Sequence, residues 1–582
     1  MRRLAVAWLA ASATAALAAP AGYAAPPVPF GHACVPQDGV LFCPTASDSE
    51  RVPSWDGVPL DVDVTLPPSG DGPFPTIVMM HGYGGNKSAF ESHSPDGSYN
   101  NVFYALQGYA VVNYSARGFG RSCGVLDSRT SPGCDRGWLH LADHRYEGRD
   151  TQHLLGLLVD QGVTKPDAIG VTGVSYGGIQ TLNLARLRNR VRMEDGSFTE
   201  WRSPDGSPLA ITAGFARWPG SDLIYALQPN GRFLDFRTPR RNDAIRPGGV
   251  MKKSYIDVLY ASGNAAGFYE PKGGPFDADL TTWKELADRG EPVRPDALAV
   301  GRELTNFHSW AGLTGRSAAL IVQNGWTDDL FPAEEALRVY RTFRPAPGAT
   351  LSLELGDLGH PRGTNNPAEN AAMTARANAF FAAYLKGQGR APRDRSVLAF
   401  TQVCGTGARA SARFRAGTWK ALHPERVTAI SFRSQRIRSD GGDDQTAAAI
   451  DPIGGGGACA TVPAQRAPGT ANLRVRFPRT FTMLGMPTVR ARIRTGGRGG
   501  FIAARLWDVF EGRQTLVTRG VYRLRDNQRG RIRFQLFGNG WRFRKSHTAR
   551  LELVGRDPNF LRTSNFRFSV RVSRLRVDLP VQ

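Results

Sequence analysis

The chain lacks the sequence features that mark metal, redox and membrane-spanning proteins. Only six of its 582 residues are cysteine, no C-x-x-C motif occurs, and no zinc-ligand spacing is found. Beyond residue 24, no apolar run reaches the length of a bilayer span. We therefore expect no bound metal, no cofactor and no transmembrane segment.

The first residues have the pattern of a secretory signal peptide. Residues 1–3 are Met-Arg-Arg, residues 4–19 are apolar, and small residues follow up to Ala24. This order predicts a signal peptide over residues 1–24, and hence a protein that is secreted, either extracellular or associated with the cell envelope. A transmembrane anchor is less favoured, because the apolar run is short for a bilayer and ends at Pro20.

The six cysteines fall into three pairs that are local in sequence. An oxidising compartment favours disulfides over free thiols, and proximity favours one pairing among the 15 that six cysteines allow. Buried free thiols are the alternative. The predicted pairs are Cys34 with Cys43, Cys123 with Cys134, and Cys404 with Cys459.

Acidic residues are scarce in the C-terminal third alone. Residues 401–582 contain 34 Lys and Arg against 11 Asp and Glu, whereas residues 1–400 contain 39 and 40. So basic a segment could make a weak contact with a polyanion or the cell wall. The favoured interpretation is arginine on solvent-facing strand positions, because the arginines alternate with apolar residues and do not cluster with aromatics. We expect no nucleic-acid partner.

Strands and helices alternate in the first part of the chain. Residues 60–66 alternate like an antiparallel strand, residues 76–80, 110–114 and 169–172 have the composition of buried strands, and residues 142–158 have a helical pattern. Alternating strands and helices predict a parallel sheet with helices on its faces.

The middle and the end of the chain have different patterns. Residues 195–315 lose the alternation and contain scattered aromatics, which predicts an inserted cap. From about residue 395, segments such as 473–477 and 489–494 alternate with period two, which predicts an antiparallel β-sandwich of the jelly-roll kind. The acidic loop at 439–458 could bind calcium, but a solvated loop is favoured.

Residues 168–179 contain the motif that carries most information about function. A short strand pattern is followed by Gly173-Val-Ser175-Tyr-Gly177 and then by a helical pattern. This is the nucleophile elbow of an α/β-hydrolase, in which a tight turn lifts the serine hydroxyl out of the sheet. A second G-x-S-x-G surrounds Ser122, but no amphipathic helix follows it. We therefore predict Ser175 as the nucleophile and Ser122 as a structural loop residue.

A serine nucleophile needs a base and a carboxylate that orients the base. In α/β-hydrolases the order along the chain is serine, acid, histidine. Asp328 follows a late strand and is the predicted acid, with Asp329 as the alternative because it is adjacent. His360 lies in the loop after the last strand and is the predicted base. The alternative is that His360 is an ordinary surface or core histidine without a catalytic role.

Negative charge develops on the carbonyl oxygen during attack, so hydrogen-bond donors must be in place beforehand. The backbone N–H of Tyr176 is one predicted oxyanion donor. Tyr83, in the segment 81–85 after an early strand, is the second, through its backbone N–H or its hydroxyl. The alternative is that the glycines of this segment only make a turn and that Tyr83 packs.

These signals combine into one architecture. The predicted fold class is α/β: an α/β-hydrolase domain with an inserted helical cap, followed by a C-terminal β-sandwich (jelly roll). The predicted boundaries are the signal peptide at 1–24, the hydrolase domain at 25–194 and 316–395, the cap at 195–315, and the jelly roll at 396–582.

Several of these segments resemble one family. Gly173-Val-Ser-Tyr-Gly-Gly178, the segment 114–124 and Gly325-Trp-Thr-Asp328 are similar to motifs of the Xaa-Pro dipeptidyl-peptidase and cocaine-esterase-like (CocE/NonD) serine hydrolases. Segments 485–492, 504–509 and 519–523 resemble that family's jelly roll. The resemblance implies a triad of Ser175, Asp328 and His360 and an oxyanion role for the Tyr83 hydroxyl. Family members more often have Pro-Tyr where this chain has Gly82-Tyr83.

The sequence therefore predicts a secreted serine hydrolase that cleaves an ester, amide or peptide bond through an acyl-enzyme. Release of Xaa-Pro dipeptides is one form of this hypothesis, and hydrolysis of small acyl esters without peptidase activity is another. Acidic residues that would hold a peptide's amino terminus are not identified in the cap. A catalytically vestigial surface protein that binds polyanions is the alternative from a different class.

Overall fold

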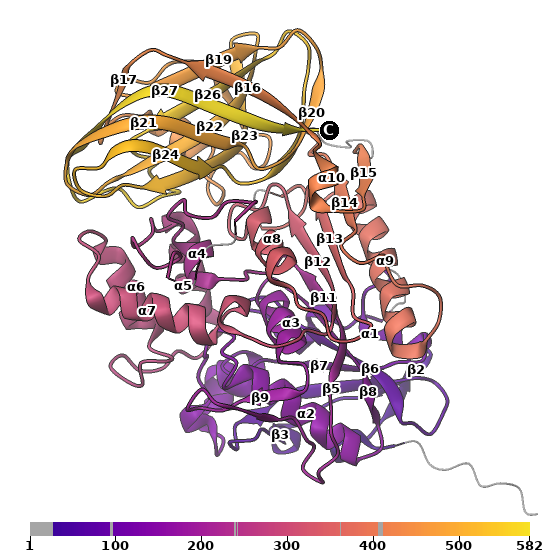
Figure 1. Cartoon of the computed structure of the whole chain (residues 1–582). Helices are drawn as coiled ribbons and strands as arrows, with labels where there is room; N and C mark the ends of the chain where they lie inside the picture. The colour runs from indigo at the N-terminus through magenta and orange to yellow at the C-terminus, as the bar shows by residue number, and fades with distance from the viewer. Residues whose placement is uncertain (1–26, 94–96, 238–239, 241, 361–362, 405–410) are drawn as a thin grey trace, which may run out of the picture.

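The computed structural model describes residues 27–93, 97–237, 240, 242–360, 363–404 and 411–582 (Figure 1). The predicted signal peptide lies outside these ranges. Within them, no helix combines the length and the apolar character needed to cross a bilayer.

A mixed sheet of eleven strands forms the centre of the described hydrolase domain. Its order is β1-β2-β5-β7-β6-β8-β11-β12-β13-β14-β15, and the neighbours from β7 to β14 run parallel. The central strands are buried on both sides, as expected of a parallel sheet that helices cover. The strands are β1 (Val35–Gln37), β2 (Val40–Cys43), β5 (Val62–Leu66), β6 (Phe74–Met80), β7 (Ala110–Tyr114), β8 (Thr164–Val174), β11 (Ile211–Arg217), β12 (Ala319–Gly325), β13 (Leu351–Gly356), β14 (Val397–Phe400) and β15 (Arg413–Ala416).

Helices cover both faces of this sheet, and alternate residues of each strand pack against the helices on opposite faces. Ile321 of β12 packs in one apolar cluster with α1 (Asn101–Leu106) and α9 (Pro367–Lys386). Its neighbour Val322 packs in another with α2 (Glu147–Asp160), α3 (Tyr176–Leu187) and α8 (Ala333–Thr342). Successive side chains of a strand point to opposite faces, so each strand contributes to both cores.

Two boundaries differ from the sequence prediction. Residues 195–315 were assigned to the cap, but β11 lies inside them and pairs in parallel with β8 and β12 at the centre of the sheet. The jelly roll was assigned from residue 396, but β14 and β15 continue the hydrolase sheet to Ala416. In both places pairing with distant strands decides the assignment, and this pairing leaves no trace in the local sequence.

The helices over the catalytic end of the sheet begin after β11. They pack on one side of the hydrolase domain, below the jelly roll in Figure 1. We propose this segment as the cap. Its helices are α4 (Leu223–Leu227), α5 (Lys253–Ala266), α6 (Leu280–Arg289) and α7 (Pro295–Phe307).

The C-terminal part is an antiparallel sandwich of two sheets, which confirms the predicted fold class. One sheet has the order β24-β21-β27-β20-β25, with β16 and β17 also paired to β27, and the other has the order β18-β23-β22-β26-β19. Leu506 and Val570 belong to the core between them. The strands are β16 (Glu425–Ser431), β17 (Gln435–Arg438), β18 (Thr461–Pro463), β19 (Ala471–Arg476), β20 (Phe481–Gly485), β21 (Thr488–Gly497), β22 (Phe501–Phe510), β23 (Arg513–Arg523), β24 (Arg529–Gln535), β25 (Asn539–Phe543), β26 (Thr548–Val554) and β27 (Phe568–Val581).

The acidic loop at 439–458 is partly helical. Asp443 caps the short helix α11 (Asp444–Ala449) by accepting from the Thr446 N–H, and Asp451 accepts from the backbone of Ile453 and Gly454. These two carboxylates are used in local turns, which favours the structural interpretation over a calcium site.

All three predicted cysteine pairs are disulfides. Cys404–Cys459 closes a loop of 55 residues and ties the end of the hydrolase sheet to the start of the sandwich. Cys34–Cys43 closes a loop of only nine. If a disulfide acts mainly by restricting the unfolded chain, the longer loop contributes more.

We expect replacement of both Cys404 and Cys459 by Ser to lower the free energy of unfolding by about 4 kcal/mol, from the loop-closure entropy. The matched change at Cys34 and Cys43 should cost about 2.5 kcal/mol. Urea titrations of the two double variants measure both values. An equal or larger loss for the shorter loop would contradict this account.

Candidate active site

Ser175 occupies the strained turn between β8 and α3. Its φ of 54° and ψ of −109° are outside the regions that ordinary residues favour. Its backbone N–H donates to the Arg217 carbonyl of β11 (2.9 Å), and the Gly177 N–H donates to the His81 carbonyl (3.0 Å). The two neighbouring strands thus fix the elbow from both sides.

The glycines that flank Ser175 are required by close packing of backbones. A Cβ at Gly177 would lie 2.1 Å from the Met80 carbonyl oxygen, and a Cβ at Gly173 would lie 2.6 Å from the same atom. No side chain fits at these distances, so the glycines of the predicted elbow have a direct steric reason.

The structure brings Ser175, His360 and Asp328 into one line of hydrogen bonds. Ser175 Oγ lies 2.7 Å from His360 Nε2, and His360 Nδ1 lies 2.7 Å from Asp328 Oδ2. A neutral histidine that donates from Nδ1 to Asp328 leaves Nε2 free to accept the serine proton. Phe331 packs edge-on against the imidazole, with ring centroids 5.2 Å apart.

The acid is held by its own loop. Asp328 is fully buried, and its second oxygen Oδ1 accepts from the backbone N–H groups of Leu330 (3.0 Å) and Phe331 (2.9 Å). A buried carboxylate needs such donors to remain charged. These bonds leave Oδ2 directed at His360, which orients the base.

The alternative acid, Asp329, points elsewhere. Its Oδ2 lies 3.2 Å from Nε of Arg519, on β23 of the jelly roll. Lys252, just before α5, donates from Nζ to the carbonyls of Asp329 (2.7 Å) and Leu330 (2.9 Å). All three side chains are buried. The acid loop is therefore held from the cap side and from the jelly-roll side at once.

The two predicted oxyanion donors differ in how far the geometry supports them. Among the described residues, the Tyr176 N–H donates to no backbone carbonyl, so it is available at the start of α3. The Tyr83 hydroxyl lies 2.7 Å from that of Tyr269, which itself donates to the Tyr260 carbonyl (3.1 Å). The Tyr83 proton is therefore directed at Tyr269. Burial raises the pKa of Tyr83 well above its ordinary value, so the group remains a donor.

A cavity of about 140 Å³ lies beside Ser175 and has an almost entirely apolar lining. Tyr83 and Phe331 form part of its wall. The cap supplies much of the rest: Leu223 and Leu227 of α4, Leu259 of α5, Trp283 of α6 and Leu304 of α7. Lys284 also lines the cavity, but Asp257 and Asp288 pair with its ammonium group. Among the described lining residues there is no carboxylate.

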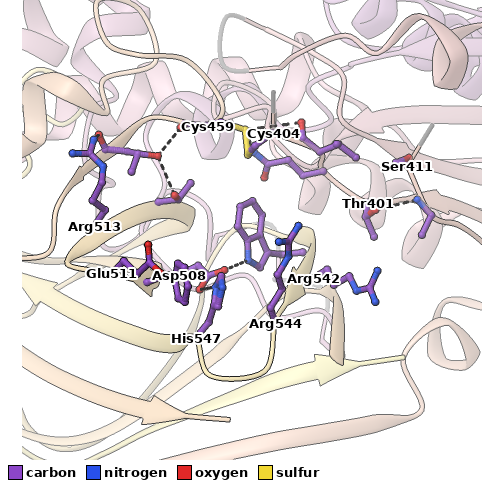
Figure 2. A pocket seen from close by; sticks show the side chains of 17 residues that line it. Thr401, Cys404, Ser411, Cys459, Asp508, Glu511, Arg513, Arg542, Arg544 and His547 are labelled. Atoms are coloured by element: carbon purple, nitrogen blue, oxygen red, sulfur yellow. Dashed lines mark hydrogen bonds and ion pairs between the residues drawn. A yellow bond between two sulfur atoms is a disulfide. The ribbon is translucent and has the colours of Figure 1, made fainter. Parts of the chain in front are cut away.

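A larger cavity, of about 940 Å³, lies away from the triad, where the hydrolase sheet meets the sandwich. Figure 2 shows the Cys404–Cys459 disulfide across this cavity from Arg542 and Arg544. None of the triad residues lines it. The candidate active site is therefore chosen by the triad contacts beside the smaller cavity and not by cavity size.

Ser122, in the second G-x-S-x-G, is a structural residue. Its hydroxyl is buried, donates to the Ser115 carbonyl (2.7 Å) and accepts from the Asp61 N–H (2.8 Å). Among the described residues no histidine hydrogen-bonds to this hydroxyl, in agreement with its predicted role.

Asp143, Glu303 and His308 are one group whose ligand atoms are close enough to share a metal ion, all within 4.8 Å of one another. The Arg145 guanidinium already hydrogen-bonds to both carboxylates. The positive charge of Arg145 already neutralises the two carboxylates, as a bound metal ion would. We therefore interpret the cluster as a structural contact between the segment before α2 and the end of α7, and not as a metal centre.

Sequence reasoning missed several residues that build the site. Arg217 ends β11, which lies inside the predicted cap, and no role is predicted for Tyr269 from the sequence. Lys252 and Arg519 are ordinary basic residues in sequence. Their roles come from contacts over more than 70 residues, and no local signal could have identified them.

Comparisons with known proteins agree with the geometry. Residues 56–191 match the family model of X-Pro dipeptidyl-peptidase (S15 family). Over 163 residues the chain is 27% identical to dipeptidyl aminopeptidase BIII of Pseudoxanthomonas mexicana, a match that covers 28% of this chain and only 21% of that protein.

Two solved structures share the whole architecture. A CocE/NonD family hydrolase from Staphylococcus aureus has a TM-score of 0.59 at 14% identity, over 93% of this chain and 94% of that one. An alpha-amino acid ester hydrolase has a TM-score of 0.55 at 14% identity, over 95% and 98%. At this identity the likeness concerns the fold. Together the matches confirm the predicted resemblance and support a serine hydrolase of peptidase or esterase type.

His81 links the Tyr83 segment to the elbow, and its burial makes the stability of the fold depend on pH. Its Nδ1 donates to the Gly82 carbonyl (2.7 Å) and its Nε2 accepts from the Ala116 N–H (2.9 Å). A second proton on Nε2 would point at the Ala116 N–H and would break this hydrogen bond. Burial lowers the pKa of His81 to about 4. The unfolded chain, with an ordinary pKa of about 6.5, therefore binds more protons between these two values.

We expect the His81 contribution to stability to be complete above about pH 6.5 and to be lost as the pH falls towards 4, by roughly 1.4 kcal/mol per pH unit. Urea midpoints at pH 7, 6 and 5 measure the loss. His81→Gln should start less stable but decline less steeply. Parallel slopes for wild type and variant would show that other groups dominate.

Proposed function

We propose that the chain is a serine hydrolase that cleaves an ester or amide bond through an acyl-enzyme. In the first step, His360 Nε2 takes the proton of Ser175 Oγ as the oxygen attacks the carbonyl carbon. Asp328 stabilises the imidazolium that forms, without accepting its proton. The contacts of 2.7 Å from serine to base and from base to acid carry this proposal.

The tetrahedral intermediate needs donors for its oxygen. The Tyr176 N–H is the first donor in this proposal. Tyr83 is the second, and its hydroxyl would have to turn its proton from Tyr269 towards the oxyanion. The imidazolium then gives its proton to the leaving group, and water repeats the sequence to release the acid and restore Ser175.

The cavity favours an apolar acyl group as the substrate part next to Ser175. Its lining is apolar, and no described carboxylate is available there to hold the ammonium group of a peptide. Matched relatives include an ester hydrolase and a dipeptidyl aminopeptidase, so both chemistries remain within reach of the fold. We propose ester or acyl-amide hydrolysis as the main activity and Xaa-Pro dipeptide release as the second candidate.

We also propose that the protein is secreted. The signal-peptide pattern of residues 1–24 and the three disulfides support this. The complete line of triad contacts argues against a vestigial hydrolase domain that serves only as a support for polyanion binding.

A fluorophosphonate probe tests the nucleophile. We expect the wild type to be labelled at Ser175, and Ser175→Ala to lose labelling and to lower kcat by about 10⁴-fold or more. Ser122→Ala serves as the matched control and should keep its label. Labelling that survives in Ser175→Ala would refute the assignment.

Substrate class is tested by kcat/KM for nitrophenyl esters of increasing acyl length beside Ala-Pro-nitroanilide. An apolar cavity predicts that ester hydrolysis improves with acyl length until the cavity is full and exceeds turnover of the dipeptide. Trp283→Asp, which puts a charge in the cavity wall, should lower the preference for longer acyl chains. Faster cleavage of Ala-Pro-nitroanilide would make the peptidase the main activity.

A further inference from the structure

The outer face of the seven-stranded sheet of the jelly roll carries a ladder of arginines. In the strand register, Arg490 of β21 lies between Arg533 of β24 and Arg576 of β27. Two residues along β21, Arg492 lies directly opposite Arg531. Cross-strand neighbours are about 5 Å apart and residues i and i+2 about 7 Å apart. The guanidinium groups therefore form a closely spaced cationic plane.

The plane extends one step further along the strands. Arg494 lies between Arg529 and Arg571, and Arg571 is also opposite Arg436 of β17. Alternate residues such as Ile493 point into the sandwich core, so the arginines point outward. We call the outward arginines of β21, β24 and β27 the arginine face; Figure 1 shows these strands side by side.

Like charges directly opposite each other destabilise a sheet. The second sheet also has facing arginines, but there the buried ones are paired with carboxylates: Arg505 with Asp557 (2.5 Å) and Arg550 with Glu552 (2.7 Å). Arg519 of that sheet reaches the hydrolase domain at Asp329. The outer side of the second sheet thus contacts the hydrolase domain. The arginine face, on the other sheet, also meets the rest of the molecule at one end, where the Arg533 guanidinium lies 4.0 Å from the Phe236 ring.

The arginine face has little neutralisation of its own. Asp578 pairs with Arg576 (2.7 Å) and lies 3.5 Å from Arg490. Among the described residues no carboxylate lies within ion-pair distance of Arg492, Arg494 or Arg531. These three charges have no carboxylate partner within the described part of the chain, so they are open to an anionic partner.

Exposed apolar side chains border the same face. Ile430 of β16 lies directly opposite Arg576 and is 48% exposed. It lines a shallow hollow of about 340 Å³ together with Arg490 and Arg531. Phe432, the first residue after β16, is 72% exposed. Such a mixture of cationic and apolar groups suits a partner that is both anionic and apolar.

We propose that the arginine face, with Ile430 and Phe432, is a peripheral binding surface for an anionic lipid bilayer. The guanidinium groups bind lipid phosphates, which they match with paired donors. Ile430 and Phe432 enter the boundary between headgroups and acyl chains. A dissolved polyanion would use the arginines but would gain nothing from Phe432, and the lipid surface accounts for both. This proposal does not depend on the proposed hydrolase function.

Vesicle co-sedimentation with the full chain tests the proposal. We expect binding to vesicles of equal parts phosphatidylglycerol and phosphatidylcholine at 50 mM NaCl, strong reduction at 500 mM NaCl, and no binding to phosphatidylcholine alone. Removing one arginine near an anionic surface weakens binding about fivefold. The double variant Arg492→Glu/Arg531→Glu should therefore bind at least 25-fold more weakly.

Two further variants separate a lipid partner from a soluble polyanion. Ile430→Ser/Phe432→Ser keeps every charge and should weaken vesicle binding at least fivefold, while its elution from a heparin column stays unchanged. Arg390→Glu/Arg393→Glu changes the net charge equally on exposed residues of the hydrolase domain and should bind vesicles like the wild type. Thermal melts confirm that each variant is folded.

Three results would overturn the proposal: equal binding to neutral vesicles, full vesicle binding by Ile430→Ser/Phe432→Ser, or equal losses for the two charge-reversal variants. The second result would reassign the arginine face to a soluble polyanion.

Discussion

The geometry of the proposed active site depends on how the loop that contains Asp328 is held. Asp328 is fully buried, and a charged carboxylate in such a place is costly unless donors surround it. Its own loop provides two N–H groups and His360 provides a third contact. The loop stays in this shape because Lys252 binds two of its carbonyls and Arg519 pairs with Asp329. In the proposed mechanism, this arrangement orients His360 as the base and, through it, Ser175 as the nucleophile.

This arrangement gives the outer parts of the chain a role in the chemistry. Lys252 precedes the first long cap helix and Arg519 belongs to the sandwich. Both bind the loop just after Asp328, Lys252 at the carbonyls of Asp329 and Leu330 and Arg519 at the Asp329 carboxylate. The cap also provides most of the apolar wall beside Ser175. The hydrolase sheet alone would supply the three triad residues, but neither the rigid support of the acid nor the substrate cavity.

Sequence was informative where a local constraint has a local pattern. Ser175 is predicted from a turn that demands glycine on both sides, and the structure has such a turn there. Asp328 is preferred to Asp329 because adjacent residues after a strand point in different directions, and it is Asp328 that contacts His360. The jelly roll appeared through its period of two. The sequence does not reveal β11 (Ile211–Arg217), because this strand is short and rich in small side chains. The hairpin of residues 190–200 before it also interrupts the alternation of strands and helices. The partners of Asp329 and of the Tyr83 hydroxyl lie too far along the chain for any spacing rule.

The Cys404–Cys459 disulfide affects how the molecule responds to proteases. It spans the passage from the last strands of the hydrolase sheet to the sandwich. A single peptide-bond cleavage anywhere between the two cysteines leaves both fragments covalently joined. Nicking of the backbone and loss of the basic sandwich are therefore separate events, and the second also requires a reductant. In surroundings rich in proteases but poor in thiols, the molecule would remain in one piece after such a cut.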